Sequence, residues 1–294
     1  MSEAALIELD GVDGSHWTLS GPGYGAEGVE FATSPAGIYD APVTVPWNSS
    51  AYQPGATPGH PTWLKRDVTF SVNIFRTEFN SWQEVDSAWR KAWSYLQDST
   101  LSITTESGTR RLKLRMTQQP EFKPANDPHV KQWGRITMMC TAGVPWWTED
   151  DVIGTDTTVT NTTSSGTETL WVPVANPTDQ ELYLRWVLPA ASANTQWTVP
   201  DFSWKDDENA NRAIELPTQT TGQHLTIDTD PMEEMIVCAD GSQFWARMNG
   251  RMFEFPVPAY TPRTLLPVQV SGVPANTTVM VRCPRNWSRP WGLQ

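Results

Sequence analysis

The sequence is poor in the residues from which most active sites are built. Its 294 residues include three cysteines and four histidines, and neither type is clustered. It also lacks the His-Glu-x-x-His, Cys-x-x-Cys, Gly-x-Ser-x-Gly and Gly-x-x-x-x-Gly-Lys motifs of metal, nucleophile and phosphate sites. Catalytic groups can converge from distant positions, yet these absences favour a protein that is not an enzyme and needs no cofactor or metal. Cys140, Cys238 and Cys283 are expected to be buried free thiols.

Long apolar runs and an excess of positive charge are missing as well. No stretch reaches the roughly 18 apolar residues of a membrane span, and the first ten residues lack the basic segment that begins a secretion signal. We therefore expect no membrane partner. The 21 Lys and Arg are outnumbered by 33 Asp and Glu, and the net charge of -12 argues against binding nucleic acid through its phosphates.

What the sequence has in excess is tryptophan, with 16 residues beside 24 prolines and 19 glycines. Tryptophan is enriched where protein surfaces meet partners. The length of the chain predicts two domains. The tryptophan excess points to contacts with other molecules before it points to chemistry.

The first half has the pattern of a β-rich domain with one helix. Apolar and polar residues alternate over residues 66–75, 101–106 and 111–116, and residues 133–141 are a further strand candidate. Ser107-Gly108 predicts a hairpin turn, and Ser81-Trp-Gln-Glu84 has the form of a helix capping box. We predict a helix over residues 81–97. Its apolar stripe, expected to pack on the sheet, consists of Trp82, Val85, Trp89, Trp93 and Leu96.

Two surfaces of this domain are candidates for contacts with another subunit. The predicted strand 111–116 carries Arg111, Lys113 and Arg115 on one face, where they could meet an acidic neighbour or simply be solvated. Residues 40–63 are too rich in Pro and Gly for regular structure to be expected, and such long segments are usually functional or disordered. The segment also contains Trp47, Tyr52 and Trp63, and we favour an arm that packs on a neighbouring subunit over a floppy loop.

The second half is predicted to be a β-sandwich. Residues 154–169 are almost entirely small and polar, which indicates a linker or an exposed edge, and we place the domains at residues 1–148 and 149–294. Short strand candidates separated by Pro, Gly and Asn follow, with no helical period. They lie at residues 170–174, 180–188, 196–199, 213–216, 224–228, 234–238, 244–248, 251–255, 265–270 and 277–282.

Acidic clusters in the second half could in principle supply paired carboxylates for glycoside hydrolysis or a cation site. Asp228 and Asp230 are the pair to inspect, although the segment lacks the third ligand and the Gly of a calcium loop. Solvated loop charge is the simpler interpretation. A hydrolase that degrades cell walls is therefore the least favoured of three hypotheses. The other two, a binding role and a structural role, are set out below.

Exposed tryptophans could instead stack on sugar rings, as in carbohydrate-binding modules. Strand alternation would bury about half of the tryptophans in the second half, and Trp204 and Trp245 are the candidates for glycan stacking. A carbohydrate-binding or host-adhesion protein is therefore the alternative hypothesis.

The order of features resembles the distal tail proteins, often called minor tail proteins, of long-tailed phages. The resemblance runs from Gly143-Val-Pro-Trp-Trp147 through Val174-Ala-Asn-Pro-Thr-Asp179, Leu225-Thr-Ile-Asp-Thr-Asp-Pro231 and Phe255-Pro-Val-Pro258. It ends on Trp287-Ser-Arg-Pro-Trp-Gly292, which is similar to versions from phages of actinobacterial hosts.

The resemblance implies a mainly β fold: a β-barrel-like or split-barrel N-terminal domain with one α-helix, then a galectin-like β-sandwich. It implies a virion protein, made in the host cytoplasm, that forms a closed and by resemblance hexameric ring at the tail tip. Its expected partners are further copies of itself, the tail tube protein, the baseplate hub protein and the tape-measure protein. No catalytic residues carry over from the family. Net acidity would suit a conduit, because a negatively charged wall repels the phosphates of passing DNA.

Overall fold

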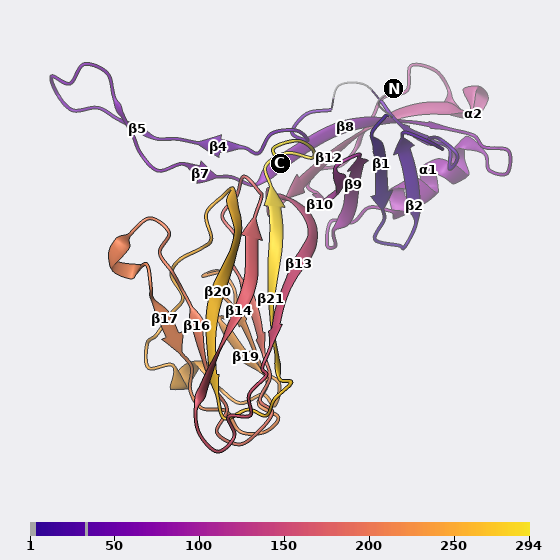
Figure 1. The fold of residues 1–294 in the computed structure, drawn as a ribbon. Helices are drawn as coiled ribbons and strands as arrows, with labels where there is room; N and C mark the ends of the chain where they lie inside the picture. The colour runs from indigo at the N-terminus through magenta and orange to yellow at the C-terminus, as the bar shows by residue number, and fades with distance from the viewer. Residues whose placement is uncertain (1–3, 33–34) are drawn as a thin grey trace. The chain divides into compact units, whose positions relative to one another are not determined.

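A computed structural model describes residues 4–32 and 35–294, and the chain in it is mostly β-structure. It divides into two compact units, the first formed by Met1–Glu149 with Trp287–Leu293 and the second by Asp150–Asn286 with Gln294. The mainly β fold predicted from the sequence is confirmed (Figure 1). One feature differs from our domain ranges: residues 287–293, which we expected in the second domain, pack in the first unit.

The first unit is built on an antiparallel sheet in the order β2-β1-β9-β10-β12-β8-β3. Strands β2 and β3 at the two ends of this order contact each other, which gives the sheet a barrel-like curvature. A short strand, β11 (Glu121–Phe122), pairs with β12. The main strands are β1 (Leu6–Asp10), β2 (His16–Ser20), β3 (Val29–Phe31), β8 (Arg66–Phe75), β9 (Ser99–Thr105), β10 (Gly108–Met116) and β12 (Trp133–Ala142).

Helix α1 (Trp82–Lys91) packs against β8 and is shorter than predicted. Its start is as expected: the Ser81 hydroxyl accepts from the Glu84 amide, and the Glu84 carboxylate accepts from the Ser81 amide. The predicted end at residue 97 is wrong. The Ser94 hydroxyl accepts from the amides of Leu96 and Gln97, and this local turn replaces the next helical turn.

The apolar stripe of α1 is core, with one exception. Trp82, Val85 and Trp89 are buried within the helix, and Trp93 is buried just beyond it, whereas Leu96 is exposed. The single-helix prediction also needs correction, because α2 (Pro128–Lys131) forms a further short turn of helix capped by Asp127. Such a four-residue helix has too few positions for an apolar period to reveal it.

Residues 40–63, for which no regular structure was expected, form a narrow antiparallel ribbon, which we call the arm (Figure 1). Four two-residue strands pair as β4 (Val43–Thr44) with β7 (Thr62–Trp63) and β5 (Trp47–Asn48) with β6 (Thr57–Pro58). Between the two ladders the Gly59 amide donates to the Pro46 carbonyl, so the two sides of the arm stay hydrogen-bonded between the β4–β7 pair and the β5–β6 pair. Prolines take part in the ribbon as acceptors: the Pro46 carbonyl accepts from Gly59 and the Pro42 carbonyl accepts from the Leu64 amide at 3.1 Å.

The second unit is a β-sandwich whose two sheets enclose one apolar core. One sheet has the order β19-β18-β15-β21-β13 and the other the order β14-β20-β16-β17. Strand β13 leads the chain out of the first unit and β21 returns it. The strands are β13 (Trp147–Thr157), β14 (Thr167–Asn176), β15 (Arg185–Leu188), β16 (Gln196–Pro200), β17 (Ala213–Glu215), β18 (Leu225–Asp228), β19 (Ile236–Cys238), β20 (Thr261–Ser271) and β21 (Thr278–Trp287).

Several strand predictions in the second unit were wrong. Residues 154–169, predicted to be a linker or an exposed edge, are partly strand, because β13 continues to Thr157 and β14 begins at Thr167. Residues 244–248 contain a 3-10 helix, η2 (Trp245–Arg247), and residues 251–255 are irregular. Another 3-10 helix, η1 (Asp207–Asn209), is capped by Asp206, whose side chain accepts from the Glu208 amide. Residues 244–248 and 251–255 contain apolar residues because these loops pack on the core of the sandwich, and a short apolar run of this kind resembles a strand in the sequence.

All three cysteines are buried and unpaired, as expected. Burial raises the pKa of the Cys140 thiol to about 12, which makes it inert at neutral pH. Across residues 4–32 and 35–294, no helix combines the length and the apolar character needed to cross a membrane.

Candidate assembly surface

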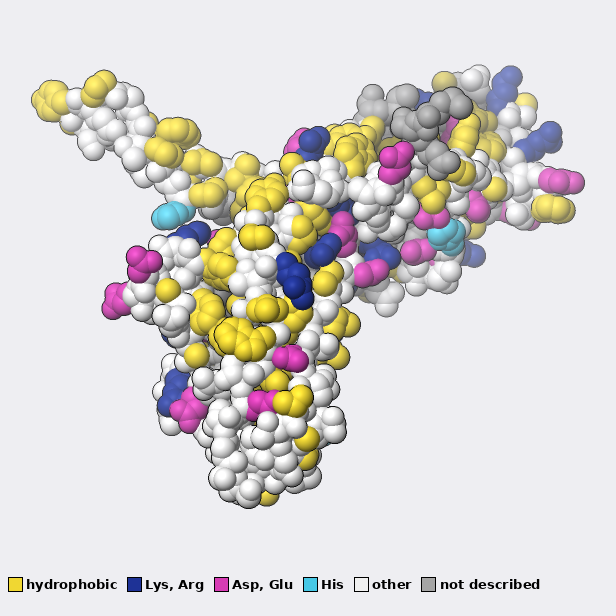
Figure 2. Space-filling view, viewed as in Figure 1, with side chains coloured by type: hydrophobic (Ala, Val, Ile, Leu, Met, Phe, Trp, Pro, Cys, Tyr) yellow, Lys and Arg dark blue, Asp and Glu magenta, His cyan; other side chains and the backbone are white. Residues whose placement is uncertain are grey.

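The arm is an exposed, uncharged and partly aromatic surface. Its residues 41–64 contain no Asp, Glu, Lys or Arg. The three aromatic residues predicted to contact a neighbouring subunit all lie on it: Trp47 is 64% exposed, Tyr52 is fully exposed at 103%, and Trp63 is 42% exposed. Figure 2 shows hydrophobic side chains along its length. A ribbon that buries so little apolar surface gains little stability from its own packing.

The root of the arm is fixed by a buried arginine, Arg66, the first residue of β8. Its guanidinium donates to four main-chain carbonyls: Nη1 to Ile38 at 2.7 Å and to Gly37 at 3.3 Å, Nε to Pro145 at 2.8 Å and Nη2 to Ser288 at 2.6 Å. Burial lowers the pKa of Arg66 to about 10, still well above neutral pH, so the side chain keeps its charge. Arg66 therefore joins the segment before the arm to the C-terminal tail, residues 287–293.

A second buried arginine, Arg110 on β10, holds the same C-terminal tail. Its Nη1 donates to the Arg289 carbonyl at 2.9 Å and its Nη2 to the Gly292 carbonyl at 3.0 Å. The guanidinium also pairs with Glu149 at 3.0 Å and lies 3.7 Å from the ring centre of Trp287, a cation–π distance. These contacts explain why residues 287–293 belong to the first unit.

Contacts between aromatic rings complete the root. Trp291 of the tail packs on Tyr39 with ring centres 5.2 Å apart, and Arg289 forms an ion pair with Asp40 at 3.1 Å. On the other strand, Trp63 meets Trp146 at 4.8 Å in an edge-to-face arrangement. Trp63 is thus partly engaged by its own chain, whereas Trp47 and Tyr52 lie farther out on the arm.

Sequence reasoning found the aromatic residues of the arm but missed the arginines that hold its root. One signal for Arg110 was available: it precedes Leu112 and Leu114 in the alternation of β10, which places a charge on the buried face. A charge there requires partners. Its partners lie up to 182 positions away in the sequence, and no local pattern identifies them.

The basic face of β10 has the predicted geometry. Arg111, Lys113 and Arg115 alternate with the buried residues, Lys113 and Arg115 are exposed, and Arg115 pairs with Asp98 at 2.6 Å. A role for this face in subunit contacts stays a prediction.

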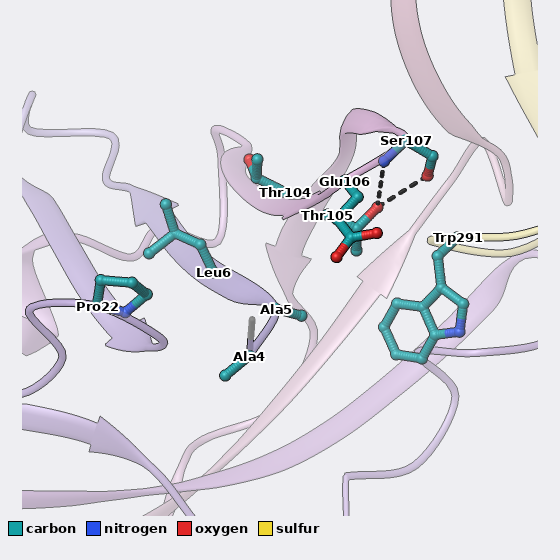
Figure 3. Close-up of a pocket in the computed structure, with 9 residues that line it drawn as sticks. All are labelled: Ala4, Ala5, Leu6, Pro22, Thr104, Thr105, Glu106, Ser107 and Trp291. Carbon is teal, nitrogen blue, oxygen red and sulfur yellow. Dashed lines mark hydrogen bonds between the residues drawn. The ribbon is translucent and has the colours of Figure 1, made fainter. Parts of the chain in front are cut away.

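A pocket with a volume of about 720 Å³ lies in the first unit beside the C-terminal tail. Figure 3 shows the indole of Trp291 on one side and Leu6 and Pro22 on the other, with the β9–β10 turn along the rim. The Thr105 hydroxyl accepts from the amide of Ser107 within that turn. Glu106, also on the turn, places a carboxylate at the pocket.

The two tryptophans singled out in the second unit line different pockets. Trp245 is 60% exposed beside a small pocket, but Trp204 packs against the sandwich core. Asp228 pairs with Arg185 at 2.6 Å and accepts from the Asp230 amide, so it serves its own turn. Among the residues that the structure describes, no group of three or more His, Cys, Asp or Glu side chains could hold a metal ion.

The acidic charge is unevenly divided between the units. The first unit has 16 Asp and Glu against 13 Lys and Arg, and the second has 17 against 8. Most of the net charge of -12 therefore belongs to the sandwich. This corrects the argument that the charge of the whole chain suits a ring wall, because the domain expected to form the ring carries a net charge of only about -3 by this count.

Comparisons with known proteins identify relatives over nearly the full length. The chain is 34% identical to the minor tail protein Gp27 of Mycobacterium phage L5 and 34% identical to that of Mycobacterium phage D29, with 98% of both chains covered in each case. No protein-family model matches the sequence.

Solved structures share the fold. The Dit protein of phage SPP1 matches with a TM-score of 0.62 at 11% identity, over 96% of this chain and 98% of that chain. A chain of the phage P2 baseplate in its activated conformation matches with a TM-score of 0.53 at 12% identity over the same shares. The chain therefore belongs to the phage minor tail protein family represented by the L5 and D29 proteins, structural components of the tail, and has the fold of a distal tail protein.

Proposed function

We propose that this minor tail protein forms a closed ring of copies at the tip of the phage tail, and that the ring joins the tail tube to the baseplate hub and lets DNA pass. The observation that carries the proposal is the arm: an uncharged ribbon with exposed Trp47 and Tyr52, held at its root by buried Arg66. Such a ribbon gains apolar burial only when another molecule covers it.

The relatives support a place in the tail tip. The SPP1 protein is described as a paradigm of hub adsorption apparatus in phages that infect Gram-positive bacteria, and the phage P2 match comes from a baseplate. The family resemblance is our reason to propose six copies in the ring. It is also our reason to propose contacts with the tube, hub and tape-measure proteins. The first unit has slightly more acidic than basic residues, 16 against 13, which also suits a channel, because an excess of cations would hold the phosphates of DNA by counterion release.

Light scattering and mass photometry of the purified protein test self-assembly. The proposal predicts a discrete species of ring mass that negative-stain electron microscopy shows as closed rings, and that binds purified tail tube or hub protein. A monodisperse monomer at all concentrations, with no binding to tube or hub proteins, would falsify it.

Glycan binding by the second unit is the alternative function, favoured by one observation. Trp245 exposes 60% of its surface beside a pocket of about 160 Å³ that Ser242 and Gln243 also line, which combines an aromatic ring with polar groups. Titration with host wall polysaccharide tests this alternative. Binding that disappears in Trp245→Ala but persists in Trp204→Ala would support it, and absence of binding to the unaltered protein would exclude it.

A further inference from the structure

We propose that the arm tip of one copy inserts Tyr52 into the pocket of about 720 Å³ on the first unit of the next copy, between Trp291 and Leu6, with the phenol hydroxyl donating to Glu106. This inference rests on the proposed ring and deepens it by naming the two surfaces that meet. Each copy would then both give an arm and receive one, a head-to-tail contact that closes into a ring.

Tyr52 has the features of an anchor. It is fully exposed, and its backbone has φ 70, a left-handed conformation that glycine adopts without strain and a bulky residue does not. The turn would fold more easily with glycine at this position. A tyrosine that stabilises neither the turn nor a core is best explained by a contact outside its own chain, and tyrosine is among the residues that dominate binding energy at interfaces.

The pocket matches a tyrosine in chemistry. The Trp291 indole and the carbons of Leu6 and Pro22 offer two apolar walls to an aromatic ring (Figure 3). At the rim, the Thr105 hydroxyl bonds the hydroxyl and the amide of Ser107, while the structure gives the Glu106 carboxylate no hydrogen bond or ion pair among the described residues. An ionised carboxylate is a strong acceptor for a phenol. The arm brings no acidic residue that would repel it.

The length of the arm fits the spacing of a ring. The pocket and the arm root are neighbours, because Trp291 lines the pocket and also packs on Tyr39 at the root. An arm that spans from its own root to the next copy's pocket must therefore be as long as the distance between copies. Roughly ten residues from Val43 to Tyr52 extend about 30 Å at about 3.3 Å per residue. A domain of about 150 residues is roughly 35 Å across.

Cross-linking between separately purified variants tests the contact. One population carries Tyr52→Cys and the other, with a different tag, carries Ser107→Cys at the pocket rim; the native cysteines are buried and do not compete. A short bismaleimide should join the two populations into covalent dimers, because the two positions meet between copies. The control pairs Tyr52→Cys with Ser164→Cys, an exposed position in the second unit, and should give at least tenfold less dimer.

Three outcomes separate the inference from the proposed ring. Rings with the Tyr52–Ser107 cross-link support both. Rings of normal mass without that cross-link above control overturn the arm-to-pocket contact and leave the ring intact. Neither rings nor cross-link overturns both.

Single substitutions give a second readout. Tyr52→Ala should weaken association between copies at least tenfold, whereas Tyr52→Phe, which keeps the ring and loses only the hydroxyl, should weaken it less. An association constant unchanged in Tyr52→Ala would contradict the contact. Because Tyr52 is exposed, circular dichroism and melting of the isolated chain should be the same for all three proteins.

Discussion

The tryptophan excess separates by burial into two groups with different roles. Eight of the 16 tryptophans are buried, among them Trp89 with no exposed surface, while Trp47 on the arm and Trp245 on the sandwich are more than half exposed. Helical spacing predicted the buried group on α1 because amphipathic periodicity reports burial directly. The same composition could not separate an interface residue from a core residue elsewhere in the chain.

Trp89→Ala should lower the free energy of unfolding by about 3–5 kcal/mol. Its ring lies 5.4 Å from that of Trp17 and 5.6 Å from that of Trp93, centre to centre, so truncation opens a cavity among aromatic rings. Urea unfolding followed by circular dichroism measures the change. Trp245→Ala, at an exposed position, is the matched control and should stay within about 0.5 kcal/mol of the unaltered protein.

Stability should depend on pH through His16. A hydrogen bond to Asp10, together with the nearby Glu8 carboxylate, raises the pKa of His16 above its ordinary value of 6.5. Because the pKa of His16 is higher in the folded state, the stabilisation by the protonated imidazole is complete at pH values below the unfolded-state pKa. It is lost as the pH rises through the folded-state pKa. Since the side chain is 52% exposed, the contribution is below about 1 kcal/mol after solvent screening.

The measurement compares unfolding free energies of the unaltered protein and His16→Gln between pH 5.5 and pH 8.5, values chosen to bracket the ordinary range of about 6.5. The difference between the two proteins should shrink as pH rises. A difference that grows with pH would show that the neutral imidazole, not the cation, is the stabilising form.

At the scale of elements, the sequence predicted the helices and strands whose signals lie within a few neighbouring residues of the chain. The alternation of β8 gave the strand over residues 66–75 as observed, and the capping box gave the start of α1. The end of α1 was missed because a serine turn is decided by competition between two local hydrogen-bonding patterns. The arm was missed as a ribbon because its short ladders carry no apolar period.

Replacing residues 43–63 with a short Gly-Ser linker should leave the first unit folded. Apart from Trp63, which packs on Trp146, the arm is largely exposed, and loop closure costs little at this length, so the free energy of unfolding should change by no more than about 2 kcal/mol. Self-assembly should be lost, because the variant lacks the surface we assign to copy contacts. Calorimetry and mass photometry of the same sample measure the two effects. A variant that still forms rings would contradict a role for the arm in assembly.

Ending the chain at Asn286 should destabilise the first unit by about 3–5 kcal/mol. Truncation removes the buried ring of Trp287 and leaves Arg66 and Arg110 without the tail carbonyls that they bind. Limited proteolysis and thermal melting report the loss. Removing only Leu293 and Gln294, of which Leu293 is 37% exposed, is the control and should leave melting unchanged.

At the scale of the whole molecule, the composition and the strand pattern predicted a β-rich protein of two domains, and the resemblance of short motifs indicated the tail protein family; neither located the assembly surface. The family expected from the motifs is the one to which the relatives in phages L5 and D29 belong. The root of the arm depends on contacts such as Arg66 with Ser288, 222 positions apart, which only the folded chain brings together. The division of charge between the units likewise required the structure, because residues 287–293 return to the first unit.

Cryo-electron microscopy of intact virions labelled with antibody against the second unit tests the ring at the tail tip most directly. We expect label at one end of the tail only, around a ring of density between the last tube ring and the baseplate, with connecting density that the arm fits from copy to copy. Label along the length of the tube, or isolated copies at fibre tips without a ring, would contradict it.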